Sequence, residues 1–296
     1  MLPLTDIVPP FLGVAAIAYA ILAVRVARSA PHNPNNAVSI FLFLMAGFCV
    51  GASFSYGAVD PNMYGIGRVF SFFSAGFAAV VFFMIYREYT VGRAGWLVIM
   101  MLSIVPMATT GLALTNPMHE MIWAVTETKT GLVFSDITEH YWYNKIYAPF
   151  TYGLIAYSAF GLVVRLPTIT PAHRKTIGIL LACALLPYGI SIANTFLGMG
   201  PPEFPFTAST IALMWPFFAW ASLKLRVHDF SPLAYKTLFD HVRDPIFVID
   251  KDQCIICANK AGQDLLGDAE QGLIGKRLWE DYPAARSILE QARELD

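Results

Sequence analysis

The sequence predicts an all-α membrane protein, a bundle of seven transmembrane helices followed by an incomplete α+β domain. Composition is the first indication: 56% of the 296 residues are hydrophobic and 14% are charged, with a mean hydropathy of +0.54. A soluble domain usually carries about 25% charged residues. The deficit of charge lies in residues 1–225, and the remainder has an ordinary soluble composition. The net charge of -1 gives no indication of a nucleic-acid partner, and we expect none.

Seven apolar runs are each long enough to cross the hydrocarbon core of a bilayer, which takes about 20 residues. We expect these spans at Ile7–Val26, Val38–Val59, Val69–Tyr86, Trp96–Leu114, Ile146–Val164, Ile177–Leu197 and Phe206–Leu223. The first run does not resemble a signal peptide, because no Lys or Arg precedes it and Arg25 and Arg28 follow it. Pro106, Pro187 and Pro216 fall inside runs and predict kinks that open space between helices.

The basic residues predict how the chain crosses the membrane. They concentrate in alternate connections, at Arg25, Arg28, Arg87, Arg93, Arg165, Arg174, Lys175, Lys224 and Arg226. The opposite connections hold Lys129 and Lys145, with Arg68 at the edge of the third run. Because cytoplasmic loops carry an excess of Lys and Arg, we expect a multi-pass protein of the cell (inner) membrane. Its N-terminus is then extracytoplasmic and its tail cytoplasmic.

The connection Thr115–Lys145, on the predicted extracytoplasmic side, holds the most specific cluster of polar and aromatic residues in the membrane half. Asn116-Pro117 ends the preceding helix, because proline excludes its predecessor from the α region. We expect His119 and Trp123 to share one face of a short turn that follows. The candidate ligand contacts are Asn116, His119, Glu120, Trp123, Arg68, Trp142 and Asn194.

Two interpretations stay open for this connection. Its aromatic residues are also typical of the belt at a membrane interface, but a connection of this length more often folds over something than hangs free. Arg68 either faces a pocket, as ionisable residues at membrane depth do by default, or extends its guanidinium into water. A lid or pocket wall is the hypothesis that makes the connection functional.

Several kinds of chemistry lack the residues they need. The seventh run has no lysine at mid-membrane, since Lys224 stands at its inner end, and a retinal Schiff base therefore has no amine. The stretch HEMIW departs from a zinc-protease helix because Trp123 stands where a second His is needed. Cys254 and Cys257 fall three residues apart in a predicted strand, on opposite faces. We expect no catalytic residue, no metal site and no cofactor in this chain.

The tail predicts a connector helix and then a short α+β segment. Ser231-Pro232 is typical of a helix start. Strands are expected at Ile246–Asp250 and Cys254–Ala258 around a polar turn. A helix capped by Asn259 and ended by Gly267 follows. This order of elements resembles the first half of a PAS domain.

The residues that carry the PAS resemblance are DPIFVIDKDQCIICANKAGQDLLG and LIGKRL. Pro245 departs from the pattern, since related sequences usually have Gly there. A PAS domain needs three further strands, and none is expected before Asp296. Because two strands with an uncovered apolar face are marginal in water, we expect this chain to be a fragment cut inside the PAS domain.

Nearly the whole chain resembles the N-terminal seven-helix sensor region of bacterial and archaeal histidine kinases, joined to PAS. The stretches that match are LTNPMHEMIW at Leu114, Thr115, Asn116, His119 and Trp123, HRKTIGILLACALLP at the sixth run, and DFSPLAYKTLFDHVRDPIFVID at the junction. The resemblance implies a seven-transmembrane sensor domain at 1–226, a connector at 227–242 with its helix Pro232–Val242, and the truncated PAS domain at 243–296. The same module precedes diguanylate cyclases, and the output domain therefore stays open.

The resemblance implies a receptor that binds an extracytoplasmic small molecule of unknown identity and passes the signal through the seventh helix to PAS. The expected coupling residues are Lys224, Arg226, Pro232 and Asp244. The parent protein would be a histidine kinase that uses ATP and Mg²⁺ in a domain beyond this chain, acts as a homodimer among membrane lipids and addresses a response regulator. The alternatives are a cyclase parent or, less in keeping with the absence of repeated broken helices, a transporter or channel with a regulatory tail.

Overall fold

The computed structural model describes residues 4–29, 37–92, 94–128, 131–134, 140–168, 171–197, 205–224, 239–249, 254–267, 273 and 276. The chain divides into two compact units, residues 1–229 and 230–296.

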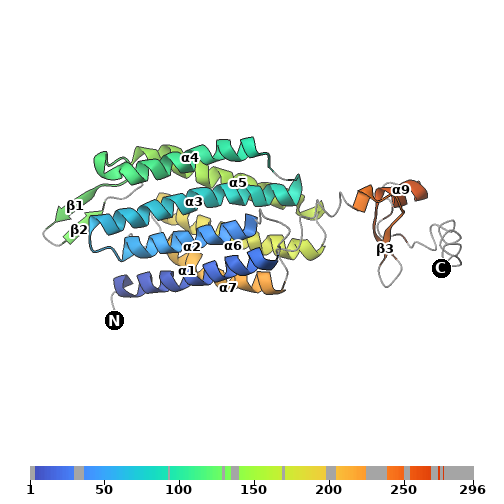
Figure 1. Ribbon diagram of the computed structural model, residues 1–296, viewed down its shortest axis with the longest axis horizontal. Helices are drawn as coiled ribbons and strands as arrows, with labels where there is room; N and C mark the ends of the chain where they lie inside the picture. Colours follow the sequence, from blue (N-terminus) through green and yellow to red (C-terminus); the bar gives the residue numbers. More distant parts are fainter. Residues whose placement is uncertain are drawn as a thin grey trace. The chain divides into compact units, whose positions relative to one another are not determined.

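The described part of the first unit contains seven long helices, as predicted (Figure 1). They are α1 (Leu4–Ser29), α2 (Ala37–Tyr56), α3 (Pro61–Thr90), α4 (Trp96–Thr115), α5 (Ala148–Arg165), α6 (Pro171–Leu197) and α7 (Phe206–Lys224). Six of these spans are long and apolar enough to cross a membrane, and the apolar part of α7, Phe206–Trp220, is shorter. The molecule is therefore a multi-pass, mostly helical membrane protein.

Shorter elements connect the helices. The connection from α4 to α5 contains the 3₁₀ turn η1 (Asn116–Met118), the strands β1 (Val125–Thr128) and β2 (Gly131–Phe134), and the π-helical turn η3 (Tyr143–Tyr147). The strands pair antiparallel, with Val125 opposite Phe134. A second 3₁₀ turn, η4 (Leu166–Thr168), follows α5. The hairpin was not predicted.

Helix α3 is longer than its apolar run predicts. It begins at Pro61, eight residues before the expected Val69, because Asp60 caps it. The Asp60 carboxylate accepts hydrogen bonds from the backbone N–H groups of Asn62 and Met63, both at 2.9 Å. A capped start with proline at the first position is stable without apolar residues. Arg68 is consequently the eighth residue of α3, at the start of its third turn, rather than at the edge of the helix.

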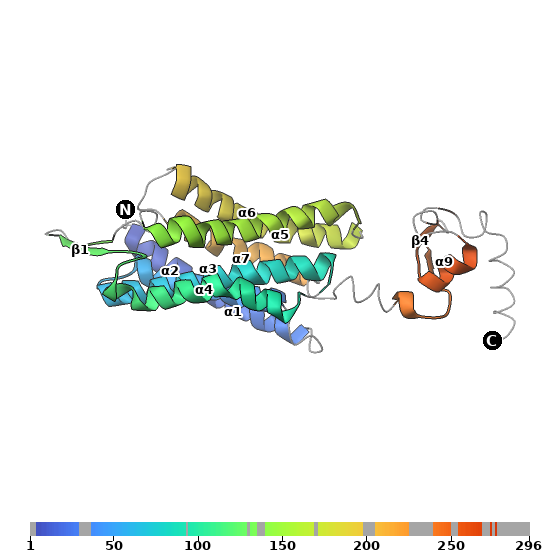
Figure 2. The same cartoon turned by 90° about the horizontal axis from the view of Figure 1, so that it is seen from above.

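The helices form a ring with α4 outside it (Figures 1 and 2). Helix α2 packs between α1 and α3, α5 packs against α3 and α6, and α7 packs against α6, α1 and α2. Helix α4 lies against α3 and η3. The first turns of α1 lie at the same end of the bundle as β1 and β2, which we call the hairpin end (Figure 1).

The α2–α3 contact is close because both helices present glycine to it. A Cβ atom on Gly51 would lie 2.6 Å from the Gly67 carbonyl oxygen and 2.7 Å from the Ser71 nitrogen. Gly47 and Ser55 extend this line of small residues on α2, at four-residue spacing on either side of Gly51. Small residues at this spacing let helix backbones approach in membranes.

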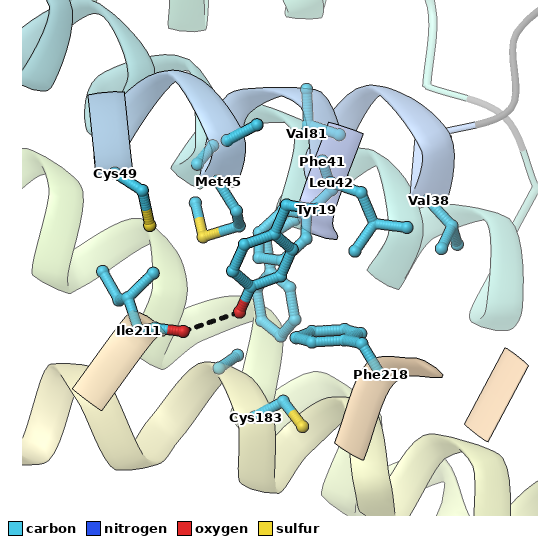
Figure 3. Packing of buried hydrophobic residues seen from close by; sticks show 14 of the residues in the cluster. Tyr19, Val38, Phe41, Leu42, Met45, Cys49, Val81, Cys183, Ile211 and Phe218 are labelled. Atoms are coloured by element: carbon cyan, nitrogen blue, oxygen red, sulfur yellow. Dashed lines mark hydrogen bonds between the residues drawn. The ribbon is translucent and has the colours of Figure 1, made fainter. Parts of the chain in front are cut away.

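The main core is apolar and joins the first helix to the last (Figure 3). The buried Tyr19 hydroxyl of α1 donates to the Ile211 carbonyl of α7 at 2.7 Å. The Tyr19 ring meets Phe218 edge-on at 6.2 Å, and Phe41 of α2 lies 6.0 Å from Phe218. Pro216 lies inside α7 between these contacts. The bond from Tyr19 thus ties α7 to α1 next to the position where proline interrupts its hydrogen-bond ladder.

The second unit has the predicted PAS elements. Strands β3 (Phe247–Ile249) and β4 (Ile255–Ala258) pair antiparallel, and α9 (Lys260–Leu266) follows. The Asn259 side chain caps α9 through Gly262 N–H at 2.9 Å, and Gly267 ends it with a φ of 72°. Phe239–His241, inside the predicted connector helix, is helical, and Val242 is not; residues 225–238, with Arg226 and Pro232, lie outside the described residues.

Candidate ligand site

An aromatic cluster fills the hairpin end of the bundle between α3, α4 and η3. Its rings are those of Tyr64, Phe72, Trp123, Tyr143 and Tyr147, all of them buried. Trp123 lies parallel to Phe72, with ring centres 6.4 Å apart and an interplanar angle of 7°, and it meets Tyr64 nearly edge-on at 6.1 Å. This cluster is separate from the main core. We call it the aromatic cluster.

Asn116 places Trp123 in the cluster. Its buried side chain donates through Nδ2 to the Trp123 carbonyl at 2.8 Å, and its Oδ1 accepts from the N–H groups of Ile122 at 2.9 Å and Trp123 at 3.4 Å. The side chain therefore satisfies backbone groups that would otherwise be buried without partners. Asn116 is buried, and its side chain bonds its own loop.

The sequence predicted that His119 and Trp123 share one face of a helical turn, and in the structure they do not. The helical turn ends at Met118, because Asn116 draws the chain back to close a loop at Ile122. The Met121 N–H donates to His119 Nδ1 at 3.0 Å. The ring therefore carries its proton on Nε2, which lies 3.0 Å from Thr115 Oγ1. His119 is half-buried and fixed to the last turn of α4.

Glu120 occupies the left-handed region, with a φ of 49°. Its N–H donates to the Asn116 carbonyl at 2.7 Å, which closes the turn after η1. Its side chain is exposed. A non-glycine residue in this conformation is uncommon and is held there by its surroundings.

Two aromatic residues fasten the start of α5 to the neighbouring helices. Trp142 donates through Nε1 to Thr109 Oγ1 of α4 at 2.9 Å. Tyr147 donates to the Phe72 carbonyl of α3 at 3.0 Å. Tyr147 lies in the π-helical turn η3, and such turns are frequent at functional sites. The described ends of the long connection therefore pack on the bundle rather than extend freely from it.

Arg68 lies beside the aromatic cluster. Its Nε donates to the Tyr64 hydroxyl at 2.8 Å, and its Cζ lies 4.9 Å from the centre of the Tyr64 ring. The hydroxyls of Tyr56 and Tyr143 are within electrostatic reach. Arg68 is half-buried as a residue, and its guanidinium has aromatic rather than acidic neighbours.

A hydrogen-bonded chain of hydroxyls leads from the cluster to α6. Tyr143 is hydrogen-bonded to Tyr152 of α5. The Tyr152 hydroxyl lies 2.7 Å from Ser191 Oγ of α6, and its ring meets Tyr188 edge-on at 5.7 Å. Sequence reasoning missed these residues, although buried tyrosines in apolar helices indicate that hydroxyl partners are close.

The remaining candidates lie elsewhere. Asn194 stands one turn after Ser191 on α6, half-buried, and within the described chain no hydrogen bond joins it to the cluster. Lys224 ends α7. Asp244 is exposed, and its carbonyl accepts from Asn259 Nδ2 at 2.8 Å. Of the candidates, Arg68 and Trp123 thus both contact Tyr64. Asn116 bonds the backbone of Trp123, and Trp142 bonds α4 nearby.

Comparisons with known proteins agree with this architecture. A family model described as the N-terminal 7TM region of histidine kinase matches residues 11–232. A model of the PAS fold matches residues 233–295. A search of curated proteins finds no match.

Proposed function

The chain belongs to the family of N-terminal seven-transmembrane regions of histidine kinases, and on that basis we propose that it is a receptor for an extracytoplasmic small molecule. A sensor region of this kind implies a response regulator as partner and dimerisation of the kinase. The signal would reach PAS through α7 and the connector. Kinase chemistry, with ATP and Mg²⁺, would belong to a separate transmitter domain.

The observation that carries the receptor proposal is the construction of the hairpin end. Trp142 and Tyr147 hold the connection between α4 and α5 onto α4 and α3 by hydrogen bonds, and Asn116 closes the loop of this connection onto itself. Buried bonds of this kind indicate a fixed wall rather than a simple link between spans. The wall borders a half-buried cation and a set of stacked rings, the mixture of apolar surface and few polar groups that ligand sites use.

Orientation supports an extracytoplasmic site. The exposed Arg28, Arg165 and Arg174 lie near the helix ends opposite the hairpin end. Because an excess of basic residues marks cytoplasmic loops, the hairpin end would face outward. We therefore place the site on the extracytoplasmic side and PAS in the cytoplasm.

The proposed relay begins where α7 is tied to α1 by Tyr19. Its far end is the Asn259 side chain, which donates to the carbonyls of Val242, at 3.1 Å, and Asp244, at 2.8 Å. Asn259 thereby joins the end of the connector to the start of α9 within the second unit. A ligand drives such a relay only if it binds two arrangements of α7 with different affinity.

The proposal is tested by determining from which side of the membrane a signal acts. Membrane vesicles of known orientation are prepared from cells that produce the intact kinase, with ATP on the PAS side, and fractions of the growth medium are added to either face. We expect a fraction that changes phosphorylation from the hairpin face. Trp142→Phe, which removes the bond to Thr109, should shift its dose dependence, whereas the control Tyr141→Phe at an exposed neighbour should not. A response obtained only from the PAS face would contradict the proposal.

A further inference from the structure

Arg68 is a cation whose surroundings do not neutralise it. Arg68 stands roughly 10 Å along α3 from the first helical residue, at 1.5 Å per residue. Its hydrogen bond and its ring contact are both with the phenol of Tyr64. The other groups that act on it electrostatically are the hydroxyls of Tyr56 and Tyr143. Within the described residues, no carboxylate pairs with Arg68.

The nearest acidic group along the helix is already engaged. The Asp60 carboxylate, two turns before Arg68, accepts the N–H groups of Asn62 and Met63 as the cap of α3. A charge removed from water without a counter-ion is costly, and arginines at membrane depth are rare and face a partner or a watery cavity. Within the described residues, no counter-ion offsets this cost at Arg68.

The guanidinium of Arg68 also has N–H donors that no described residue accepts from. Nε is used by Tyr64, whereas the two Nη groups form no hydrogen bond within the described chain. Among described side chains, the fully buried polar atoms without a partner are Ser55 Oγ and Arg87 Nε. The Nη groups of Arg68 have no partner among the described residues and are not among these atoms, so they are not fully buried. A planar pair of N–H donors of this kind matches the two oxygens of a carboxylate.

What surrounds the donors specifies the rest of the ligand. Trp123 and Phe72 stack in parallel, and the Tyr64 ring stands across them beside the guanidinium. We infer that Arg68 and the aromatic cluster recognise a carboxylate anion that carries an apolar body, with Arg68 binding the carboxylate. This inference rests on the proposed receptor function and names the class of its ligand.

Such an acid can arrive from water or from the outer leaflet, and two probes separate these sources. Benzoate is water-soluble, and decanoate partitions into the bilayer. Benzamide has the shape of benzoate without its charge. The whole chain is reconstituted in nanodiscs of zwitterionic lipid and titrated with each probe by isothermal calorimetry at constant pH.

We expect saturable binding of benzoate, decanoate or both, at least tenfold tighter than binding of benzamide. Arg68→Gln should lose at least tenfold in affinity for the anion, and Arg68→Lys, which keeps the charge without the planar fork, should lose less. The matched control is Arg28→Gln, at an exposed arginine in the last turn of α1, which should bind as the original chain does. Benzoate binding indicates a ligand from water, and binding of decanoate alone indicates one from the lipid phase.

Three results would overturn the inference: no saturable binding of either acid, equal binding of benzoate and benzamide, or equal affinity in folded Arg68→Gln. The comparison with benzamide needs no variant and decides the matter even if Arg68→Gln fails to fold. This binding assay does not depend on signalling, so the two proposals can fail separately. If the kinase responds to an external signal and Arg68→Gln does not change that response, the receptor function stands and the carboxylate ligand is refuted. If the acid binds and the kinase responds to no external signal, the carboxylate site stands and the receptor function is refuted.

Discussion

A single amide side chain shapes the loop that covers the hairpin end. Asn116 spans six to seven residues and bonds both the N–H and the carbonyl of Trp123. The loop can bury Trp123 only because these backbone groups have a partner inside the protein. Asn is suited to the position because it has an acceptor and a donor on one short, uncharged side chain.

Replacing Asn116 by alanine should therefore loosen the loop. Asn116→Ala leaves the buried N–H of Ile122 and the carbonyl of Trp123 without partners, and we expect a loss of about 2–3 kcal/mol in the free energy of unfolding. Hydrogen–deuterium exchange of peptides that span 116–124 should become faster. Asn62→Ala, at an exposed position in the first turn of α3, is the control and should exchange as the original chain does. Unchanged exchange in Asn116→Ala would show that the Asn116 side chain does not stabilise the loop.

Glu120 gives a second prediction at the residue scale, because its φ of 49° is strained for a side chain with a Cβ atom. Left-handed backbone costs a non-glycine residue about 1 kcal/mol. Glu120→Gly should leave the free energy of unfolding unchanged or raise it by up to about 1 kcal/mol. Glu120→Val, with a β-branched side chain, should lower it. Denaturation midpoints in detergent measure both, and equal midpoints for the two variants would refute the argument from backbone strain.

Helices α2 and α3 pack closely, and their contact depends on the lack of a side chain at Gly51. Gly51→Ala puts a methyl group 2.6 Å from the Gly67 carbonyl oxygen, and the helices must separate to admit it. We expect a loss of about 1–3 kcal/mol, the range for overpacking. Gly13→Ala in α1 is the matched control, since a Cβ atom there meets nothing within 4 Å. It should be neutral or stabilising, as alanine is in helices. Thermal unfolding of the two variants in the same detergent tests the difference.

Helix positions followed from the sequence more closely than the site did. The predicted starts at Trp96 and Phe206 match those of α4 and α7, because long apolar runs leave few alternatives in a membrane. The start of α3 was misplaced, since the cap at Asp60 is polar and a search for apolar runs passes over it. Local patterns thus placed the spans and missed what lies between them.

Arg68 and Trp123 were both named from the sequence as candidate ligand contacts, and in the structure both contact Tyr64. Their role in binding stays a prediction. The cluster itself was missed, because Phe72 and Tyr147 are far apart in the chain and a local pattern does not record such contacts. The roles of Asn116 and His119 also depend on bonds that close the loop over several residues. These depend on tertiary geometry rather than on helical periodicity.

At the scale of the whole molecule, the direction in which the bundle crosses the membrane decides which end can meet an external ligand. The hairpin end and the connection from α3 to α4 lie at opposite ends of α4. Met118, 87% exposed, marks the first end, and Val91, 50% exposed, marks the second. A cysteine at each position therefore reports the orientation, in a background where Cys254 and Cys257 are replaced by serine.

We expect Met118→Cys to react with a membrane-impermeant maleimide in intact cells and Val91→Cys to react only after permeabilisation. Cys49 and Cys183 are buried in the helices and should stay unlabelled in both conditions. We expect this pattern because arginines are in excess at the end of the bundle that carries Val91, and basic loops remain on the cytoplasmic side. The reverse labelling pattern would put Arg68 and the aromatic cluster inside the cell. The proposed ligand would then have to be a cytoplasmic acid, and α7 would not be carrying an external signal to PAS.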